Sequence, residues 1–285
     1  MSFDDIFVLS QYLTPQHLLS RTAGKVAQCK IPTIKNPLIR WFVDHYQVNM
    51  SEALIENPEE FSHFNDFFTR ELKADARKID TGKKAIVSPV DGAISQLGKI
   101  KQGQIFQAKG QSFNVVDLLG GDTDRAQPFM GGDFSTIYLS PKDYHRIHMP
   151  ITGTLREMVY IPGKLFSVNP VTTAKVPRLF ARNERVAAIF DTEAGPMALV
   201  LVGAMIVASI ETTWAGLVAP IRRQVKDFQY GDANKAITIK KGEEMGRFKL
   251  GSTVVMLFPE DLAKFEENLT AESPVQMGQR FGTFA

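Results

Sequence analysis

Beyond residue 85 the chain alternates between short apolar runs and turns, and this pattern restricts its fold more than any other feature. The runs are rich in Val, Ile, Phe and Tyr, and glycine and proline separate them. They are Ala85–Val87, Gln104–Ala108, Ser135–Leu139, Thr154–Tyr160, Val186–Asp191, Met197–Ile210, Ala236–Ile239 and Gly246–Phe258. Runs of this kind are typical of antiparallel sheet. Residues 240–245 are predicted to form the loop of a hairpin that leads into the last run.

The first 72 residues indicate helices instead. Thr14-Pro15 and Asn36-Pro37 each place a residue that can cap a helix before a proline that suits the first helical position. Apolar side chains near the end of this region recur at helical spacing, namely Phe64, Phe67, Phe68 and Leu72. The sequence therefore predicts a helical region before the strands.

Together these patterns predict an α+β protein rather than a βαβ nucleotide-binding fold. We expect a helical region over 1–72, a polar connector over 73–84 and a β-rich antiparallel domain over 85–285. The 285 residues, 44% apolar and 22% charged, are enough for a buried core. A net charge of +2 gives no general case for nucleic-acid binding. The single cysteine, Cys29, excludes an intramolecular disulfide and a cysteine-rich zinc site.

Residues 14–40 contain five basic side chains, no acidic one and interleaved apolar residues. A basic and apolar helical stretch can lie in a membrane interface and attract anionic lipid. The alternative is a helical pair that packs on the domain with its charges in water. The longest apolar run, Met197–Ile210, is shorter than the roughly 20 residues of a membrane span. Any membrane contact is therefore expected at the surface of the bilayer.

Two histidines, His145 and His148, lie three residues apart in the segment 141–150, which follows a predicted strand. Acid–base work by one or both is one interpretation, and a structural pair is another. Zinc is a third, but it needs three or four ligands, and a carboxylate would have to complete the site. The other histidines, His17, His45 and His63, have no partner in the sequence that indicates chemistry, so we expect them to pack or to lie on helix surfaces.

Two further short segments complete the candidate chemistry. Asp91 lies in Ser-Pro-Val-Asp-Gly, where Asp-Gly is ordinary turn chemistry, but an acid can also orient a histidine. Gly251 and Ser252 interrupt the last apolar run, which is compatible with a bulge. Alternatively, Ser252 is a nucleophile that a base activates, and the carbonyl carbon of Gly251 is easily approached.

Taken together, these motifs resemble the phosphatidylserine decarboxylase proenzymes of the membrane-bound bacterial type. The similarity includes SPVDG, YHRIHMP and LGST, which appear in that order. It extends to FNDFFTREL, GKLFSVNP, LFARNERV and VGAMIVASIETTWAG, and so covers nearly the whole chain.

The resemblance implies that Asp91, His148 and Ser252 form a triad for self-cleavage between Gly251 and Ser252. Asp91 would hold the imidazole of His148, which takes the proton of Ser252 as its oxygen attacks Gly251. A pyruvoyl group, derived from Ser252, would then form a Schiff base with phosphatidylserine, which loses CO2 to give phosphatidylethanolamine. His145 would be the acid or base of decarboxylation. Spacing alone does not divide the work between the two histidines.

Further implications concern partners and location. The large chain 1–251 would stay with the small chain 252–285, and this pair would associate into a homo-oligomer. The enzyme would lie on the cytoplasmic side of the cell membrane, with the basic stretch and the face of Phe64, Phe67 and Phe68 in contact with lipid. Ser167 and Asn169 are candidates to bind the lipid phosphate, and no metal is expected.

Three alternatives stay open on the residues alone. A zinc or serine hydrolase with the same histidines predicts an intact chain, although no Gly-x-Ser-x-Gly motif is present. A non-enzymatic membrane carrier predicts an intact chain that is indifferent to Ser252→Ala. A pyruvoyl enzyme for a free amino acid is disfavoured by the basic and apolar N-terminal stretch.

Overall fold

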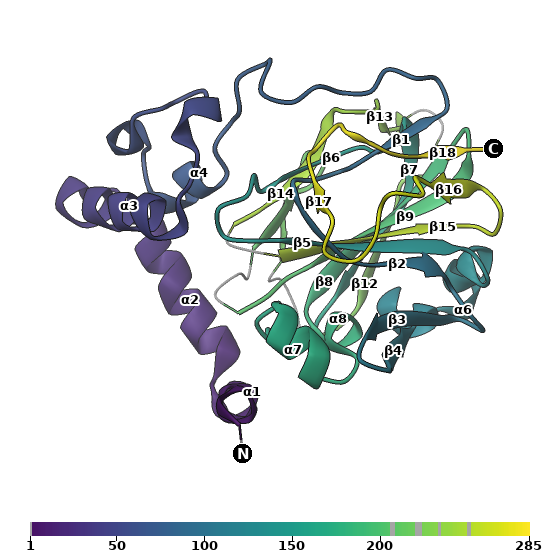
Figure 1. The fold of residues 1–285 in the computed structure, drawn as a ribbon, viewed down its shortest axis with the longest axis horizontal. Coiled ribbons are helices and arrows are strands. Elements are labelled where there is room, and N and C mark those ends of the chain that lie inside the picture. The colour runs from purple at the N-terminus through teal and green to yellow at the C-terminus, as the bar shows by residue number, and fades with distance from the viewer. Residues whose placement is uncertain (1, 206–208, 220–223, 233–234, 250–251) are drawn as a thin grey trace.

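The computed structural model describes residues 2–205, 209–219, 224–232, 235–249 and 252–285, and only the backbone of residue 252. Helices precede strands, as the sequence predicts, and the fold is α+β. The helical region contains α1 (Phe3–Leu13), α2 (Gln16–Ala27), α3 (Pro32–Tyr46) and the short α4 (Phe64–Phe68). Single 3-10 turns lie at Met50–Glu52 and Pro58–Glu60. Helices α1 to α3, here called the helical arm, run along one side of the β-rich domain (Figure 1).

The two predicted helix starts are wrong in detail. Thr14 ends α1, and the cap of α2 is Pro15, which makes no side-chain hydrogen bond. Helix α3 begins at Pro32, so that Pro37 lies inside it. Asn36 does not cap a helix because it lies inside α3. Its side-chain oxygen accepts from Lys35 Nζ at 2.6 Å, and its amide donates to the Glu59 carboxylate at 3.3 Å.

Helix α4 is shorter than the spacing of its apolar residues suggests, and its phenylalanines face inward. Phe64, Phe67 and Phe68 are all buried, in a small core that also contains Phe42 of α3. The rings of Phe42 and Phe64 meet edge to face with centroids 5.0 Å apart, an arrangement that favours aromatic packing. The expectation that this face contacts lipid is therefore wrong, because packing under α3 already removes it from solvent.

The β-rich domain is built on one large antiparallel sheet, as predicted. Within the described residues it has nine strands. In spatial order they are β12 (Lys226–Gln229), β7 (Gly153–Ile161), β8 (Arg185–Thr192), β9 (Gly195–Val202), β15 (Ser252–Phe258), β5 (Asp133–Leu139), β2 (Gly92–Lys99) and β17 (Pro274–Val275), with β13 (Thr238–Ile239) beside β7.

Smaller elements surround the large sheet (Figure 1). One small sheet contains β11 (Gly216–Ala219), β10 (Ile210–Thr212), β14 (Glu244–Phe248) and β6 (Arg146–His148). Another contains β1 (Ala85–Val87), β18 (Arg280–Phe284) and β16 (Ala263–Phe265), and β3 (Gln104–Ala108) pairs with β4 (Gln111–Asn114). The short helices are α5 (Val115–Leu118), α6 (Thr123–Ala126), α7 (Pro170–Lys175) and α8 (Leu179–Arg182), with a 3-10 turn at Gln127–Phe129.

Both faces of the large sheet are covered, which explains the unbroken apolar runs of its central strands. In β15, Val254 and Met256 belong to the core on the side of the small sheets, whereas Val255 and Leu257 belong to the core under the short helices and the β3–β4 hairpin. Successive side chains of a strand point to opposite faces, so a strand buried on both faces needs apolar residues at every position.

The segment Gly246–Phe258 is divided between two sheets, contrary to the single run predicted. Strand β14 pairs with β6 and β10, whereas β15 pairs with β5 and β9. The predicted hairpin at 240–245 is also absent, because β13 before the turn pairs with β7 of the large sheet. The turn therefore carries the chain from one sheet to another, and the predicted cleavage site lies between β14 and β15.

The helical arm has no element that could cross a bilayer. Across the described residues, no helix is both long and apolar enough to span a membrane. Helix α1 packs on the β-rich domain through Val8 and through an ion pair of Asp5 with Lys175 of α7. The arm is thus attached to the domain while much of its surface is exposed.

Candidate active site

The strand register places the segment 139–148 against both sides of the predicted cleavage site. Leu139, at the end of β5, pairs with Ser252 at the start of β15. On the other side, the Phe248 amide donates to the His145 carbonyl at 3.0 Å. Gly251 lies outside the described residues, as does the side chain of Ser252. The backbone nevertheless brings the segment of both histidines to the point where β14 gives way to β15.

His148 is half-buried, and both nitrogens of its ring have partners. Nδ1 lies 2.8 Å from the carbonyl oxygen of Gly242, and Nε2 lies 2.9 Å from the Tyr144 hydroxyl. A carbonyl can only accept, so Nδ1 carries the proton and Nε2 accepts from Tyr144. Burial lowers the pKa of His148. The ring is therefore neutral near pH 7, with a basic Nε2 lone pair.

The turn that holds His148 depends on glycine at position 242. Gly242 has a φ of +82°, and a Cβ built there would lie 2.5 Å from Cδ1 of Ile79. The Gly242 amide donates to the Met149 carbonyl at 2.8 Å, and the Lys241 amide donates to the Thr152 hydroxyl at 3.0 Å. These two bonds fix the turn directly before the Gly242 carbonyl, which sets the His148 tautomer.

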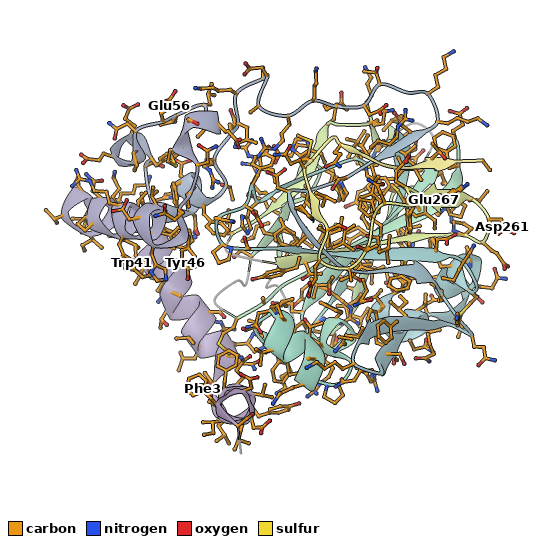
Figure 2. The ribbon with its side chains drawn as sticks, viewed as in Figure 1. Phe3, Trp41, Tyr46, Glu56, Asp261 and Glu267 are labelled. Atoms are coloured by element: carbon orange, nitrogen blue, oxygen red, sulfur yellow. The ribbon has the colours of Figure 1, made fainter. Side chains whose placement is uncertain are left out.

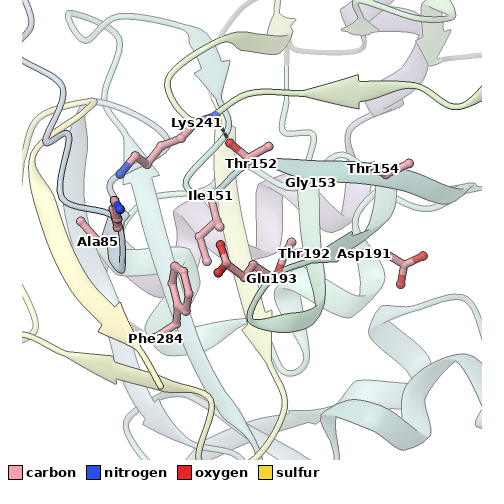
Figure 3. A pocket seen from close by; sticks show the side chains of 11 residues that line it. Ala85, Ile151, Thr152, Gly153, Thr154, Asp191, Thr192, Glu193, Lys241 and Phe284 are labelled. Carbon is pink, nitrogen blue, oxygen red and sulfur yellow. Dashed lines mark hydrogen bonds between the residues drawn. The ribbon is translucent and has the colours of Figure 1, made fainter.

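Figure 3 shows a pocket that Lys241 of this turn helps to line. Its lining includes Lys83, Ile151, Asp191, Lys241 and Phe284. None of the candidate site residues lines it. The pocket is therefore adjacent to the support of His148 and separate from the candidate site.

Asp91 is buried beside an arginine that the sequence analysis missed. Arg77 reaches both carboxylate oxygens, with Nε at 3.0 and 3.1 Å and Nη2 at 2.5 Å from Oδ2. The Met277 amide donates to Oδ1 at 2.8 Å. Asp91 and His148 are both described, and no hydrogen bond joins them. The direct Asp91–His148 bond expected for a triad is thus absent in this structure, because Arg77 and Gly242 hold the two side chains.

His145 lies deeper than His148 and has no exposed surface. Its Nδ1 lies 2.8 Å from the Asp143 carbonyl oxygen, so Nδ1 is the donor and Nε2 carries the lone pair. The ring packs on Phe68 of α4, with centroids 4.1 Å apart. Burial, helped by the positive charge of Arg70, lowers the pKa of His145 to about 3. Its Nε2 has no hydrogen-bond partner in the described part of the chain.

The candidate phosphate ligands Ser167 and Asn169 lie beside α7 and α1, and among the described residues no hydrogen bond joins them to the site residues above. The Asn169 carbonyl oxygen of the side chain accepts from the Thr172 amide at 3.0 Å and so caps α7. Its Nδ2 donates to the Ser167 hydroxyl at 3.1 Å, and the Ser167 amide donates to Gln11 of α1 at 2.9 Å. Their role toward lipid stays a prediction.

The zinc interpretation finds no ligand set in the described ranges. There, no group of three or more His, Cys, Asp or Glu side chains is arranged to hold a metal ion. Nδ1 of each of the two histidines is bonded to a backbone carbonyl. Nε2 of His148 accepts from Tyr144, whereas Nε2 of His145 has no described partner. Among the other histidines, His63 caps α4 by accepting from the Asp66 amide at 2.9 Å, and His17 bonds the Gly163 carbonyl at 3.0 Å.

Comparison with known proteins decides the family. A family model described as phosphatidylserine decarboxylase matches residues 64–283, and a second, described as PSD, matches residues 6–47. The chain belongs to the phosphatidylserine decarboxylase family. A phosphatidylserine decarboxylase proenzyme of Stutzerimonas stutzeri is 62% identical over 99% of this chain and 95% of its own length. Those of Hahella chejuensis and Azotobacter vinelandii are 61% and 58% identical, each over 98% of this chain and over 94% and 98% of their own lengths.

Four residues that contact or support the candidate site were missed by the sequence analysis. Tyr144 and Arg70 lie inside motifs that the sequence analysis quoted, but their contacts with the histidine segment could not be read from spacing. Arg77 lies in the polar connector, where one arginine among several charges carries no signal. Gly242 lies in a turn that the sequence predicted as an ordinary hairpin loop.

Proposed function

We propose that this chain is the proenzyme of a phosphatidylserine decarboxylase, which removes the serine carboxyl group as CO2 and releases phosphatidylethanolamine. The family membership and the names of the near-full-length relatives support this activity. The observation that carries the proposal is the position of the two histidines. Their segment flanks the chain on both sides of Gly251-Ser252. A hydrolase or a carrier would not require that relationship.

Self-cleavage needs only the residues of this chain. The Ser252 hydroxyl adds to the carbonyl carbon of Gly251, the peptide C–N bond breaks as the amine is protonated, and an ester remains. Loss of the Cα proton of residue 252 and cleavage of its Cβ–O bond then release the Gly251 carboxylate. The resulting dehydroalanine tautomerises to an imine, and water hydrolyses this imine to ammonia and a pyruvoyl group.

His148 is the proposed base for the first step. Its Nδ1 donates to the Gly242 carbonyl, so the lone pair lies on Nε2. This lone pair can take the Ser252 proton once the Tyr144 hydroxyl no longer donates to Nε2. Asp91 completes the proposed triad through its charge rather than through a direct bond. Against the effect of burial, the pKa of His148 is raised by its hydrogen bond to Gly242, by the charge of Glu244 and, least, by the charge of Asp91. These effects favour the imidazolium that forms.

The residues around Ser252 fit a covalent pyruvoyl group. Such a group would supply an electron-withdrawing carbonyl that takes up the electron pair left by CO2. His145 is the proposed acid or base of this stage, because its buried Nε2 carries a lone pair and has no described partner. Packing on Phe68 excludes water from one side of the imidazole. A proton held there has few competing acceptors.

The helical arm is the proposed lipid contact. Large apolar side chains are exposed along it, namely Phe3, Ile6, Leu13, Leu18, Val26, Ile31, Ile34 and Trp41. Figure 2 labels Phe3 on α1 and Trp41 on α3. Arg21, Lys25 and Lys30 of the basic stretch are exposed as well, whereas Lys35 is buried and Arg40 pairs with Glu59. An apolar surface with exposed cations suits peripheral contact with anionic lipid.

After cleavage, chains 1–251 and 252–285 are proposed to stay together. Strand β15 of the small chain is the neighbour of β5 and β9 in the centre of the large sheet, and the terminal β18 pairs with β1. Removing the small chain would open both cores. Association of this pair into a homo-oligomer stays a proposal that sedimentation of the processed protein would test.

The activity is tested by incubating the processed protein with vesicles of phosphatidylserine and phosphatidylcholine. We expect phosphatidylethanolamine and CO2 in equal amounts, and loss of both after treatment with hydroxylamine, which traps carbonyl groups. Free serine in place of the lipid separates a soluble amino-acid decarboxylase from the proposed enzyme. Absence of CO2 from a folded and processed preparation on either substrate would contradict the proposal.

A further inference from the structure

Arg70 is a buried cation whose guanidinium is only partly paired. It follows α4, and its side chain is 4% exposed. Nη2 donates to the Lys142 carbonyl at 2.9 Å and lies 3.5 Å from the Asp143 carbonyl. Nε and Nη1 are buried, and neither has a hydrogen-bond partner in the described residues. Leaving a buried donor unpaired is unfavourable, and more so for a charged group.

The other buried arginines near the site differ from Arg70 because carboxylates pair with them. Arg77 binds Asp91 and Glu52, and Arg146 binds Glu71 and Glu244. No described carboxylate pairs with Arg70. Asp143, whose backbone carbonyl lies near Arg70, directs its carboxylate to the Ser140 amide and hydroxyl at 2.6 and 2.8 Å. The cation therefore has no ion-pair partner among the described residues, although it lies 5.7 Å from the centroid of the Phe67 ring and the negative charges of Asp91, Asp143 and Glu52 act on it from a distance.

Arg70 also shares an anchor with His145. The Asp143 carbonyl accepts from His145 Nδ1 at 2.8 Å and lies 3.5 Å from Arg70 Nη2. His145 is completely buried, and its Nε2 is likewise unpartnered in the described chain. Arg70 and His145 thus share the Asp143 carbonyl, and each has buried nitrogens without a hydrogen-bond partner in the described chain. Burial lowers the pKa of Arg70 only to about 10, so the guanidinium stays charged at neutral pH.

We propose that Arg70 binds an anionic oxygen pair of the phospholipid head group, either its carboxylate or its phosphodiester, beside the His145 imidazole. The inference rests on the proposed function and adds a specificity-determining residue to it. A guanidinium is suited to this task because it presents donors in a planar fork that matches two oxygens. If the bound group is the carboxylate, decarboxylation removes the ligand of Arg70 and so weakens the hold on the product.

The test compares Arg70→Gln and Arg70→Lys with the wild type as processed enzymes. Arg185→Lys is the matched control, since Arg185 is equally buried but donates to the carbonyls of Asp117, Leu118 and Asn183. KM and kcat are measured on phosphatidylserine in mixed micelles, and intact mass reports processing. We expect Arg70→Gln to be processed and to raise KM at least tenfold, Arg70→Lys to raise it less, and Arg185→Lys to leave it unchanged.

Inhibition by phosphatidylethanolamine separates the two anions, because this lipid has the phosphodiester but no carboxylate. If Arg70 binds the carboxylate, its inhibition constant is the same for Arg70→Gln and wild type. If Arg70 binds the phosphodiester, the inhibition constant rises in parallel with KM.

Several results would overturn the inference. One is an unchanged KM in processed Arg70→Gln, and another is an equal rise of KM in Arg185→Lys. Should Arg70→Gln fail to fold or to process, Arg70→Lys decides, and a wild-type KM in that variant contradicts the proposal. A wild type without activity on phosphatidylserine would instead remove the proposed function itself.

Discussion

Arg77 and Asp91 form a bidentate ion pair that joins the connector to the turn after β1. Both side chains are buried, at 8% and 9% exposure, and Arg77 Nη2 also binds Glu52 at 2.8 Å. Glu52 lies in the 3-10 turn after α3. One guanidinium therefore ties the helical region, the connector and a proposed catalytic carboxylate together.

Arg77→Met is expected to weaken the precursor and slow its cleavage, because Asp91 would keep a buried charge without a partner. Removing one member of a buried ion pair costs about 3–5 kcal/mol. Urea denaturation in a Ser252→Ala background, where the chain stays whole, measures the change in the free energy of unfolding. Arg280→Met is the control, since the Arg280–Asp80 pair is more exposed and an exposed pair contributes little to stability. Equal losses in the two variants would contradict the assignment.

Gly242→Ala tests the support of His148. The alanine would need a positive φ and would meet Ile79, so the carbonyl that accepts from His148 must move. We expect cleavage to be slowed at least severalfold and the precursor to lose roughly 1 kcal/mol or more. Gly110→Ala is the control, because Gly110 has a φ of +77° but no atom within 4 Å of the built Cβ. Cleavage as slow in Gly110→Ala would show that backbone strain alone is responsible.

The buried His145 predicts a loss of stability in acid. Its pKa is about 3 when folded against 6.5 for the free group, so below pH 6.5 the unfolded chain binds a proton that the native chain does not. The contribution of the neutral His145 to the free energy of unfolding is complete above the unfolded pKa. Between the unfolded and the folded pKa it falls by about 1.4 kcal/mol for each unit by which the pH drops. From about pH 6 to about pH 4.5, a Ser252→Ala precursor should lose about 2 kcal/mol more than the same precursor with His145→Gln. Parallel pH dependences would contradict the buried neutral imidazole.

The helical arm predicts selective loss of vesicle binding. Leu13 and Leu18 are 78% and 61% exposed, and replacing both by serine removes apolar surface from the proposed contact. Binding to anionic vesicles should weaken roughly tenfold or more, because burying one leucine side chain contributes about 1.5–3 kcal/mol. Phe106→Ser is the control, as Phe106 is 44% exposed on β3 outside the arm. Co-sedimentation with vesicles of phosphatidylserine measures the effect, and equal weakening by both changes would argue against a specific face.

These point changes test the arm better than its deletion. Removing residues 1–60 would take away Phe42 and leave Phe64, Phe67 and Phe68 uncovered. Loss of binding would then have two explanations, whereas Leu13 and Leu18 belong to no described core.

Local pattern was enough for the fold class and for several element boundaries. The strands Ala85–Val87 and Gln104–Ala108 have the predicted bounds, because turns with glycine or proline flank them. The sequence pattern gave a wrong prediction where a tertiary contact determines which face is buried or which sheet a strand joins. Spacing put Phe64, Phe67 and Phe68 on one face of a helix, but only packing under Phe42 shows that this face is buried. The division of Gly246–Phe258 between two sheets depends on β6 and β5, which are distant in sequence.

In the candidate site, too, local sequence identified the residues but not the contacts that hold them. The motifs identified Asp91, His145, His148 and Ser252 as residues of interest, since the resemblance rests on short local segments. The partners that hold them lie far along the chain, as Gly242 does for His148 and Met277 for Asp91. Hydrogen bonds between residues separated by more than ninety positions leave no periodicity that a single sequence can reveal.

The central claim is self-cleavage between Gly251 and Ser252, and intact mass tests it most directly. Purified wild type should give a large chain of residues 1–251 and a small chain of residues 252–285, roughly 4 kDa as its share of 31.8 kDa. The small chain should carry a blocked pyruvoyl terminus, and Ser252→Ala should stay one chain. A folded wild type of a single uncut mass would contradict the account and return His145 and His148 to the acid–base groups of a different reaction.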